Sequence, residues 1–586
     1  MACLAVQRLF YFYPTMKKLR WPLLIALLSL VVIAFLLWSQ KPAILQPIGG
    51  EPQVQPAQGG IYTEGLVGSL VRLNPLLDYY NQADRDVDRL LFSGLLRFDG
   101  SGQPQAGLAD SWGISRDGTV YNFSLRTNAK WHDGQPVTSS DVLFTFDLMR
   151  DDAAPIPADL REFWKQVEIK GLDDKTVQFR LPEAFSPFMD YLTVGLLPEH
   201  LLGGMSIDEI IAADFNMQPV GNGPYKFERL IVQSGQIKGV LLAANPDYYS
   251  PPFIEQIAFR YYPDSASALA AYQGGEISGI GTVSNDILPQ VLKEANLKVY
   301  TSRLPEWTLV FLNLDNPNAV FFQDANVRKA LLMGLNRQRI INDLLGGQAF
   351  LSDGPIMPGS WAYYSGVERV NFDANTALDL LIEAGYTIPA EGGTVRTSSD
   401  GVKLSFELVY PEEAHYQAIA EAMQRDWAQI GVEVVLAPLP YDQLVSERLD
   451  GRNYQAALVD ISLARTPDPD PYPFWHQSQV TGGQNYSQWD DRQASEYLEQ
   501  ARLSTDLAER TRLYNNFQVR WSQDLPALPL FYPVYNYAVS SDVQGVSIGP
   551  LFDPSDRYAN LLEWFLVTRR GAAETATPSI TNTITP

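Results

Sequence analysis

The stretch GLADSWGISRDGTVYNFSLRTNAKWHDGQPV, residues 107–137, gives the clearest indication of the fold class. Asp117-Gly118 in its middle is a strong signal for the tight turn of a β-hairpin. Tyr121, Phe123 and Leu125 then fall at every second position, which is the pattern of a half-buried strand. The stretch therefore predicts antiparallel β structure early in the chain.

The same turn signals precede other predicted strands. Asp173-Asp174 stands before an apolar alternation over 176–181, and Asp400-Gly401 stands before a second one over 402–410. Antiparallel features are therefore expected in the early and middle parts of the chain.

Helices have equally clear start and stop signals. Asp324 is placed to cap a helix whose apolar face extends to Leu345, and Asp373 is placed to cap a helix over 374–384. Gly385 follows the second helix as a left-handed end. A further helix over 414–430 ends at Gly431.

The short apolar strand 432–436 follows that last helix at once. A helix that leads directly into a strand is typical of an α/β layer. Two more helices are predicted near the end, over 496–501 and 507–521. Together with the hairpins, these elements predict an α/β protein of two lobes, in which helices cover mixed sheets.

A series of short motifs follows a fixed order over residues 62–565. Any one of them is weak evidence, whereas the ordered series is specific. The motifs are Leu73-Asn74-Pro75, Gly94-Leu95-Leu96, Gly107–Trp112, Trp131–Val137, Gly221-Asn222-Gly223-Pro224-Tyr225, Asp324–Ala330, Gly354–Pro358, Asp468-Pro469-Asp470-Pro471 and Asn485-Tyr486. Together they resemble the ABC-transporter substrate-binding proteins of the peptide/nickel class, solute-binding family 5, which includes the dipeptide- and oligopeptide-binding proteins.

The resemblance implies a two-lobed periplasmic-binding-protein-like fold of type II, enlarged with an extra subdomain. It implies a monomer that captures peptides or related small solutes by lobe closure and delivers them to the permease and ATPase subunits of an importer. It implies no enzymatic activity, no cofactor and no metal site. An oligosaccharide, a nickel chelate or an opine are alternative solutes, and a membrane-tethered ligand sensor is an alternative role.

The expected domain boundaries follow from the same comparison. Lobe I is expected over 61–305, with an inserted subdomain at about 99–214. Lobe II is expected over 306–524, and the chain is expected to return to lobe I over 525–568. Residues 39–60 mix Pro, Gln and Gly and predict a flexible linker, and the Thr- and Pro-containing residues 569–586 predict a disordered tail.

The uncharged run from Trp21 to Trp38 predicts a membrane segment. Its 18 residues would span roughly 27 Å as a helix, close to the thickness of the hydrocarbon core. Lys17, Lys18 and Arg20 precede it and place residues 1–20 in the cytoplasm. The run is either a retained anchor or a cleaved signal peptide. We expect an anchored protein at the cell membrane, with its main domain outside the cytoplasm.

Composition excludes several classes of protein. The formal net charge is −23, so a nucleic-acid partner is not expected, because such proteins need basic surface to displace counterions. The single cysteine, Cys3, allows no intrachain disulfide and no cysteine-based metal centre. The four histidines lie far apart in the sequence, so they form no local metal-binding pair.

One departure from the family pattern bears on the ligand. In the dipeptide- and oligopeptide-binding relatives, an Asp a few residues before the Asp-Pro loop pairs with the ligand's α-ammonium group. Arg465 occupies or neighbours that position here, and Asp460 and Asp468 are the alternatives. A cation at this place would repel an ammonium and attract a carboxylate or another anionic group.

The remaining site candidates each have a structural alternative. Trp361, Trp475 and Tyr225 would give a cleft large contact areas with few rotamers to freeze, or would pack in the core. Asp468 and Asp470 would contact the ligand or form the turn around Pro469. Asn485 is a ligand-contact candidate from the Asn-Tyr motif. His132 beside Asp133 has no nucleophilic serine in an elbow motif to serve, so a catalytic triad is not expected.

Overall fold

The computed structural model describes residues 56–465 and 467–567. They belong to a compact unit that begins at Pro56. The predicted segment over 21–38, most of the predicted linker and the predicted tail over 569–586 lie outside the described residues. Within the described part of the chain, no helix is long and apolar enough to cross a membrane.

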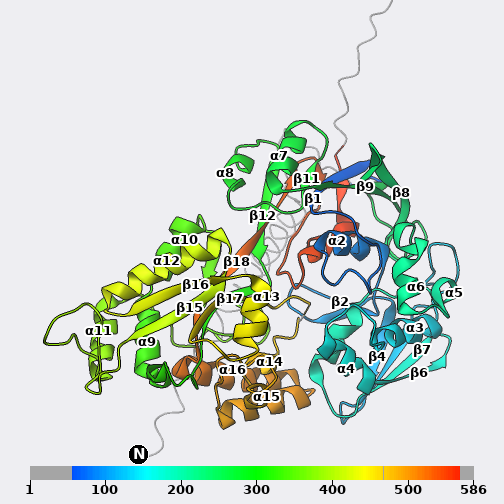
Figure 1. The fold of residues 1–586 in the computed structure, drawn as a ribbon. Coiled ribbons are helices and arrows are strands. Elements are labelled where there is room, and N and C mark those ends of the chain that lie inside the picture. The colour runs from blue at the N-terminus through cyan, green and yellow to red at the C-terminus, as the bar shows by residue number, and fades with distance from the viewer. Residues whose placement is uncertain (1–55, 466, 568–586) are drawn as a thin grey trace, which may run out of the picture. The chain divides into compact units, whose positions relative to one another are not determined.

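A large mixed sheet forms the frame of the fold (Figure 1). Its main path is β16-β15-β17-β13-β18-β11-β1-β10-β9-β8, and β12 and β14 pair with β18 beside that path. The strands are β1 (Ile61–Val67), β8 (Tyr225–Gln233), β9 (Gln236–Ala244), β10 (Gln256–Tyr262), β11 (Gly279–Ile280), β12 (Leu297–Arg303), β13 (Glu306–Leu312), β14 (Ala349–Leu351), β15 (Ser405–Pro411), β16 (Glu433–Leu439), β17 (Ala456–Ser462) and β18 (Ala527–Ser540).

Buried apolar side chains divide this frame into two main cores. We call residues 307–532, around the first core, lobe II. We call residues 62–304 and 535–566, around the second core and a small third one, lobe I. Two stretches connect the lobes. One is the short link from β12 to β13, and the other is β18, whose start pairs with β13 and whose end pairs with β12.

Lobe I carries a separate antiparallel sheet in the order β4-β5-β7-β6. Its strands are β4 (Ala109–Ile114), β5 (Val120–Leu125), β6 (Glu168–Asp173) and β7 (Thr176–Arg180). The hairpins predicted at Asp117-Gly118 and Asp173-Asp174 are confirmed, and Gly118 has the positive φ of 68° that its turn requires. Helices α3 (Ser139–Met149) and α4 (Ala158–Gln166) accompany this sheet.

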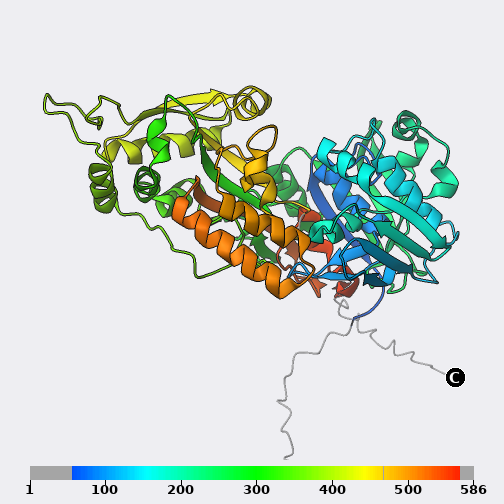
Figure 2. The same ribbon diagram turned by 90° about the horizontal axis from the view of Figure 1, so that it is seen from below.

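Lobe II is the α/β layer predicted from the helix-strand pattern. Strands β15, β16 and β17 are parallel, and α12 (Ala414–Gln429) contacts β15 and β16. Gly431 ends that helix with φ +79°, as predicted. Figure 2 shows the orange helices α15 (Arg492–Leu503) and α16 (Leu507–Asp524) side by side in this lobe.

Helix capping is confirmed at Asp373, which accepts hydrogen bonds from two amides at the start of α11 (Ala374–Glu383). It is also confirmed at Asp324, but the single helix expected up to Leu345 was wrong. The chain forms α9 (Ala325–Met333) and α10 (Arg337–Leu344) instead, because Asn336 caps a second start by accepting from the Arg339 amide.

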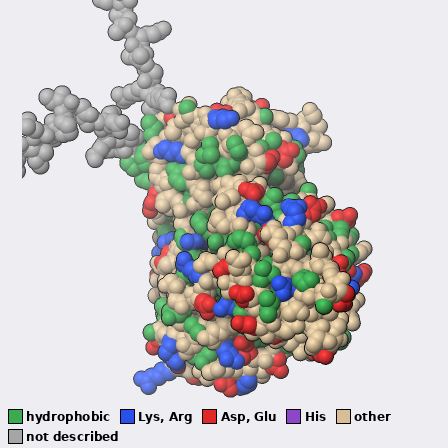
Figure 3. All heavy atoms as spheres, turned by 90° about the vertical axis from the view of Figure 1, so that its left-hand side faces the viewer, with side chains coloured by type: hydrophobic (Ala, Val, Ile, Leu, Met, Phe, Trp, Pro, Cys, Tyr) green, Lys and Arg blue, Asp and Glu red, His purple; other side chains and the backbone are tan. Residues whose placement is uncertain are grey.

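The mixed α/β fold in two lobes is thus confirmed. The surface drawn in Figure 3 carries acidic and basic side chains interspersed with small apolar groups. This mixture on the face shown agrees with the modest share of charged residues, 19% of the sequence.

Candidate functional site

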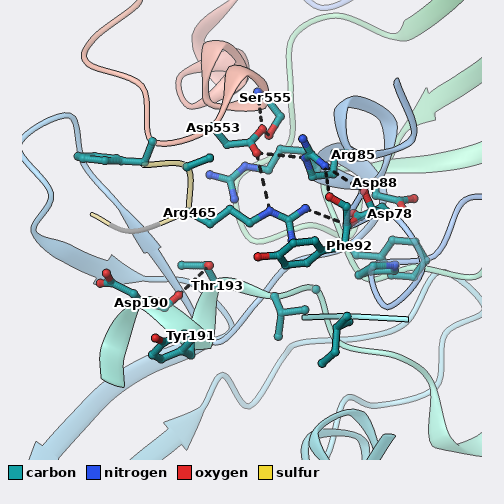
Figure 4. A pocket seen from close by; sticks show the side chains of 18 of the residues that line it. Asp78, Arg85, Asp88, Phe92, Asp190, Tyr191, Thr193, Arg465, Asp553 and Ser555 are labelled. Carbon is teal, nitrogen blue, oxygen red and sulfur yellow. Dashed lines mark hydrogen bonds and ion pairs between the residues drawn. The ribbon is translucent and has the colours of Figure 1, made fainter. Parts of the chain in front are cut away.

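A cavity of about 210 Å³ lies where both lobes meet (Figure 4). Lobe I contributes the loop 75–79, helix α2 (Gln82–Leu91), the 3-10 helix η1 (Ser186–Thr193) and the segment 552–556. Lobe II contributes Ala464, Arg465 and Pro467 from the loop that follows β17. Movement of one lobe against the other would therefore open or close this cavity.

Helix α2 supplies much of the charged wall. Asn81 caps its start, since the Asn81 side chain accepts a hydrogen bond from the Ala83 amide. Arg85, Asp88 and Arg89 follow at spacings of three and four residues, which places them on one face of the helix. That face lines the cavity.

Each arginine of the wall is neutralised by an aspartate. Arg85 Nε lies 3.1 Å from Asp553 Oδ2, and Arg89 Nη2 lies 2.9 Å from Asp556 Oδ1. Arg465 Nη2 lies 3.2 Å from Asp78 Oδ1. Burial raises the pKa of Asp78 to about 6, although Arg465 and Arg85 work against that increase.

Arg465 belongs to lobe II, and its charged side chain contacts residues of lobe I. Its amide donates to the Phe552 carbonyl at 2.6 Å, and its Nε lies 3.8 Å from Asp553 Oδ2. Its guanidinium also lies 4.3 Å from the centre of the Tyr79 ring, in cation-π geometry. Its backbone φ of 64° is in the left-handed region, which is uncommon for a residue with a side chain. The side chain is 31% exposed, so a solute can reach it.

Asp88 is a buried carboxyl group without a cationic partner. Neither of its oxygens accepts an aligned hydrogen bond from any described residue. Burial raises its pKa well above the ordinary value, the charges of Asp78 and Asp84 raise it further, and the nearby Asn74 amide lowers it only in part. Burial and its acidic neighbours therefore favour the protonated form of Asp88 in this wall.

Apolar side chains complete the cavity. They are aromatic and aliphatic side chains from the N-terminal and C-terminal segments of lobe I, namely Leu76, Phe92, Phe98, Met149, Ile156, Leu160, Val194 and Phe552. An apolar lining with a few placed polar groups is the usual composition of a site for a small molecule.

A second pair of carboxyl groups meets beside this cavity. Asp190 on η1 accepts a hydrogen bond of 2.8 Å from the amide of Asp468 in lobe II. Asp468 also pairs with Arg510 at 2.6 Å. Burial and then the Asp468 charge raise the pKa of Asp190 well above its ordinary value, and the Arg510 charge offsets this only in part.

Comparison with known proteins agrees with this architecture. The family model described as "Bacterial extracellular solute-binding proteins, family 5 Middle" matches residues 103–484, which is more than half of the chain. This chain belongs to that family.

Several related proteins match over most of the chain. The oligopeptide-binding protein AppA of Bacillus subtilis is 28% identical over 87% of this chain and 92% of its own length. Its structure in complex with a nonapeptide matches with a TM-score of 0.66 at 26% identity, covering 88% of this chain and all of that one. The Di/tripeptide-binding protein 1 of Pseudomonas aeruginosa is 26% identical over 78% of this chain and 86% of its own length.

NikZ from Campylobacter jejuni in complex with Ni(L-His) is a further structural match. Its TM-score is 0.65 at 25% identity, and it covers 86% of this chain and 99% of that one. Proteins of similar structure thus include ones solved with a nonapeptide and with Ni(L-His).

In this family 5 protein, three predicted site residues lie in or next to the loop of lobe II. Arg465 lines the cavity. Asp468 and Asp470 lie just beyond it and pair with Arg510 and Arg502, each at 2.6 Å. Their side chains thus fix the loop to α16 and α15.

Trp361 lies near that loop without lining the cavity. The Arg510 guanidinium lies 4.9 Å from the centre of its ring, and the ring of Tyr514 lies 5.7 Å away. Trp361 therefore supports the arginine that pairs with Asp468.

The structure places the other three predicted residues in the core. Trp475 packs in the lobe II core against Trp307 and Trp521. Tyr225 is fully buried, and its hydroxyl donates to the Ile254 carbonyl. Asn485 is also fully buried, and its amide donates to the carbonyls of His476 and Trp489. None of the three lines the cavity.

A second cavity of about 480 Å³ shares Tyr191 with the first, since this residue lines both. Phe163 and Phe185 of lobe I and Tyr472 of lobe II supply rings to it. Arg502 lies 3.7 Å from the centre of the Tyr472 ring. Residues of both lobes thus line each of the two cavities.

Sequence analysis missed most of the lobe I wall. Asp78, Arg85 and Asp190 were not predicted as site residues, and Asp553 was not either. A usable signal was the run DRDVDR over 84–89, because charged side chains need partners where a helix is buried.

Proposed function

We propose that this chain is the solute-binding component of an ABC importer and that it captures peptides by closing its two lobes. The observation that carries this proposal is the cavity at the junction of the lobes, with the Arg465 loop of lobe II docked on lobe I. Its similarity to an oligopeptide-binding protein and to a di/tripeptide-binding protein supports peptides as the first solute to test.

Closure would use the two connecting stretches as a hinge. The link between β12 and β13 and the middle of β18 are the backbone segments where a rotation would be absorbed. A solute that contacts both lobes does so only when they are closed. It therefore shifts the population toward the closed form.

We infer that Arg465 and the polar groups around it orient the solute. A solute carboxylate would compete with Asp78 for the Arg465 guanidinium, since both are anionic acceptors for the same donors. The apolar wall would accept side chains without strong preference, which suits a binder of varied peptides. Asp468, Asp470, Trp361, Trp475, Tyr225 and Asn485 stay predictions as direct ligand contacts, and their observed partners favour structural roles.

The location and partners follow from the same role. We propose that residues 21–38 anchor the chain at the cell membrane, that the lobes lie outside the cytoplasm as a monomer, and that the closed form docks on permease and ATPase subunits. In this role the protein carries out no chemical reaction on the solute.

The test is a thermal-shift panel on the purified full chain, followed by native mass spectrometry of any complex. Peptides of two to nine residues, oligosaccharides and Ni(L-His) would be compared at the same concentration. A ligand at one hundred times its Kd stabilises the folded state by about 2.7 kcal/mol, which gives a clear shift. We expect shifts with peptides. A response to oligosaccharides or Ni(L-His) alone would overturn the peptide assignment, and turnover of any ligand would contradict a purely binding role.

A further inference from the structure

Asp190 and Asp468 bring two carboxyl groups together across the junction of the lobes. Asp190 belongs to η1 in lobe I, and Asp468 belongs to the loop after β17 in lobe II. Asp190 is 5% exposed and Asp468 is 6% exposed, so both are shielded from water. When the lobes separate, Asp190 loses the Asp468 amide and returns to water.

The charges around this pair do not balance. Arg510 on α16 lies 2.6 Å from Asp468 and is the cation of the group. Asp470 faces the pair from the same loop, but Arg502 on α15 neutralises it at 2.6 Å. Tyr514 on α16 contributes a hydroxyl 3.4 Å from Asp468 Oδ1. Two carboxyl groups therefore share one guanidinium.

An ionised Asp190 would be costly in this place. Burial of a charge without a partner is unfavourable, and a nearby like charge adds to the cost. The pKa of Asp190 is accordingly raised well above its ordinary value, first by burial and then by Asp468. With the lobes apart, the same group would be hydrated and would have an ordinary pKa near 4.

We propose that closing the lobes is coupled to the uptake of one proton by Asp190, so that the protein closes more readily as its surroundings become more acidic. The proposal rests on the closing motion inferred under Proposed function. It adds a regulatory input to that motion, at a residue that lines the solute cavity.

The sign and the pH window follow from linkage. A group whose pKa is higher in the closed form favours closing as the pH falls through that value, and the gain ends near pH 4, where the open form is protonated too. Within the window the closing constant changes by up to about tenfold per pH unit.

Two other groups could contribute to a pH dependence. Asp78, with a pKa of about 6, also lies at the junction and acts below pH 6. Glu306 at the start of β13 has a pKa of about 8 because burial and Asp460 raise it, but Glu306 and Asp460 lie on the paired strands β13 and β17 of one sheet. The effect of Asp190 is therefore sought between pH 6 and 8, as the difference that its substitution makes.

The experiment measures the distance between the lobes without any solute. The full chain with Cys3→Ser carries Leu172→Cys in lobe I and Val435→Cys in lobe II, two exposed positions for a pair of fluorophores. Energy transfer is recorded from pH 5 to 8. We expect the closed fraction to rise as the pH falls.

Asp190→Asn is the decisive variant, because it keeps an oxygen for the Asp468 amide and removes the charge. We expect it to be at least as closed at pH 8 as the parent is at pH 5, the lowest pH tested, and to show no slope between pH 6 and 8. Asp190→Ser serves if the first variant does not fold. Asp208→Asn, an exposed carboxylate on α6 (Ile207–Ala212) in the same lobe, is the matched control and should follow the parent.

An unchanged slope in Asp190→Asn would overturn the proposal, as would a parent whose closed fraction rises with pH. The peptide panel is then added to the same labelled chain. Closure by a peptide without a difference between parent and Asp190→Asn would leave the proposed function standing and reject only the proton coupling. No closure at any pH or with any solute would reject both.

Discussion

This protein has two buried charge clusters, one within lobe I and one between the lobes. In lobe I, Arg557 lies between Glu64 and Asp86, with ion pairs of 2.9 and 2.8 Å. Across the lobes, Arg510 serves Asp468 and, more weakly, Asp190. Each cluster has two carboxyl groups for one guanidinium.

The clusters differ in the donors that surround the second carboxyl group. Glu64 has five donor atoms within hydrogen-bond distance, two from Arg557 and one each from the hydroxyls of Tyr62, Tyr537 and Tyr558. Among the described residues, the one hydrogen bond to the Asp190 carboxylate comes from the Asp468 amide. Hydrogen bonds to a carboxylate stabilise its charged form, so the lobe I cluster tolerates a charge that the interlobe cluster does not.

The difference indicates what each cluster does. The lobe I cluster joins β1, α2 and the C-terminal 3-10 helix η6 (Pro554–Tyr558), so it fixes elements that belong to one core. The interlobe cluster lies where the chain is proposed to open. A fully satisfied network favours one arrangement, whereas an incompletely satisfied one remains sensitive to protons and to movement.

The largest expected effect is that of Arg557→Met. Arg557 is 1% exposed, and its removal leaves two buried carboxyl groups without a cation. We expect the free energy of unfolding to fall by about 3 to 5 kcal/mol, as for other buried pairs broken on one side. Urea denaturation of the full chain would measure it.

The control for that measurement is Arg425→Ala. Arg425 pairs with Glu421 at 4.0 Å on the outside of α12 and is 62% exposed, so the change should stay below about 0.5 kcal/mol. Equal effects of the two substitutions would show that the lobe I cluster does not stabilise the fold as described.

The second effect concerns the interlobe cluster. Arg510→Met removes the cation shared by Asp468 and Asp190, so closing would bury two carboxyl groups without compensation. We expect peptide affinity at pH 7.5 to fall about 100-fold, equivalent to about 2.7 kcal/mol. We expect most of that loss to disappear at pH 5, because protons then replace the missing cation. Calorimetric titration at both pH values tests this. An equal loss at both would contradict the charge argument.

The sequence predicted the parts of the fold that depend on local signals. The hairpin at Asp117-Gly118, the capped helix after Asp373 and the helix-strand unit around Gly431 all occur as expected. The division at Asn336 was missed, because an Asn inside an apolar helical pattern is compatible with either a continuous helix or a new cap. Only the packed structure distinguishes these two outcomes.

The site was harder to predict for a physical reason. Arg465 was singled out because it departs from a motif, and its role as a ligand contact stays a prediction. Its partners Asp78 and Asp553 lie 387 residues before it and 88 residues after it in the sequence. Pairing at such separations depends on the docking of the lobes and leaves no local pattern. The aromatic candidates Trp475 and Tyr225 have the residue types of a cleft, yet burial alone decides between cleft and core.

The smallest expected effect concerns Arg465, whose ion pairs are partly exposed to solvent, unlike those of the two buried clusters. Arg465→Gln keeps the length and polarity of the side chain but removes its charge from between Asp78 and Asp553. Because Arg465 is 31% exposed, solvent screens these pairs, and Arg85 still faces Asp553 at 3.1 Å. We therefore expect peptide affinity to fall about fivefold, equivalent to about 1 kcal/mol, with no measurable loss of folding stability.

Arg448→Gln is the matched control, since its pair with Glu407 at 3.6 Å lies within lobe II and is similarly exposed. If Arg465→Gln weakened binding as strongly as Arg510→Met, the charge beside the cavity would matter as much as the charge buried between the lobes. The distinction between screened and shielded clusters would then fail.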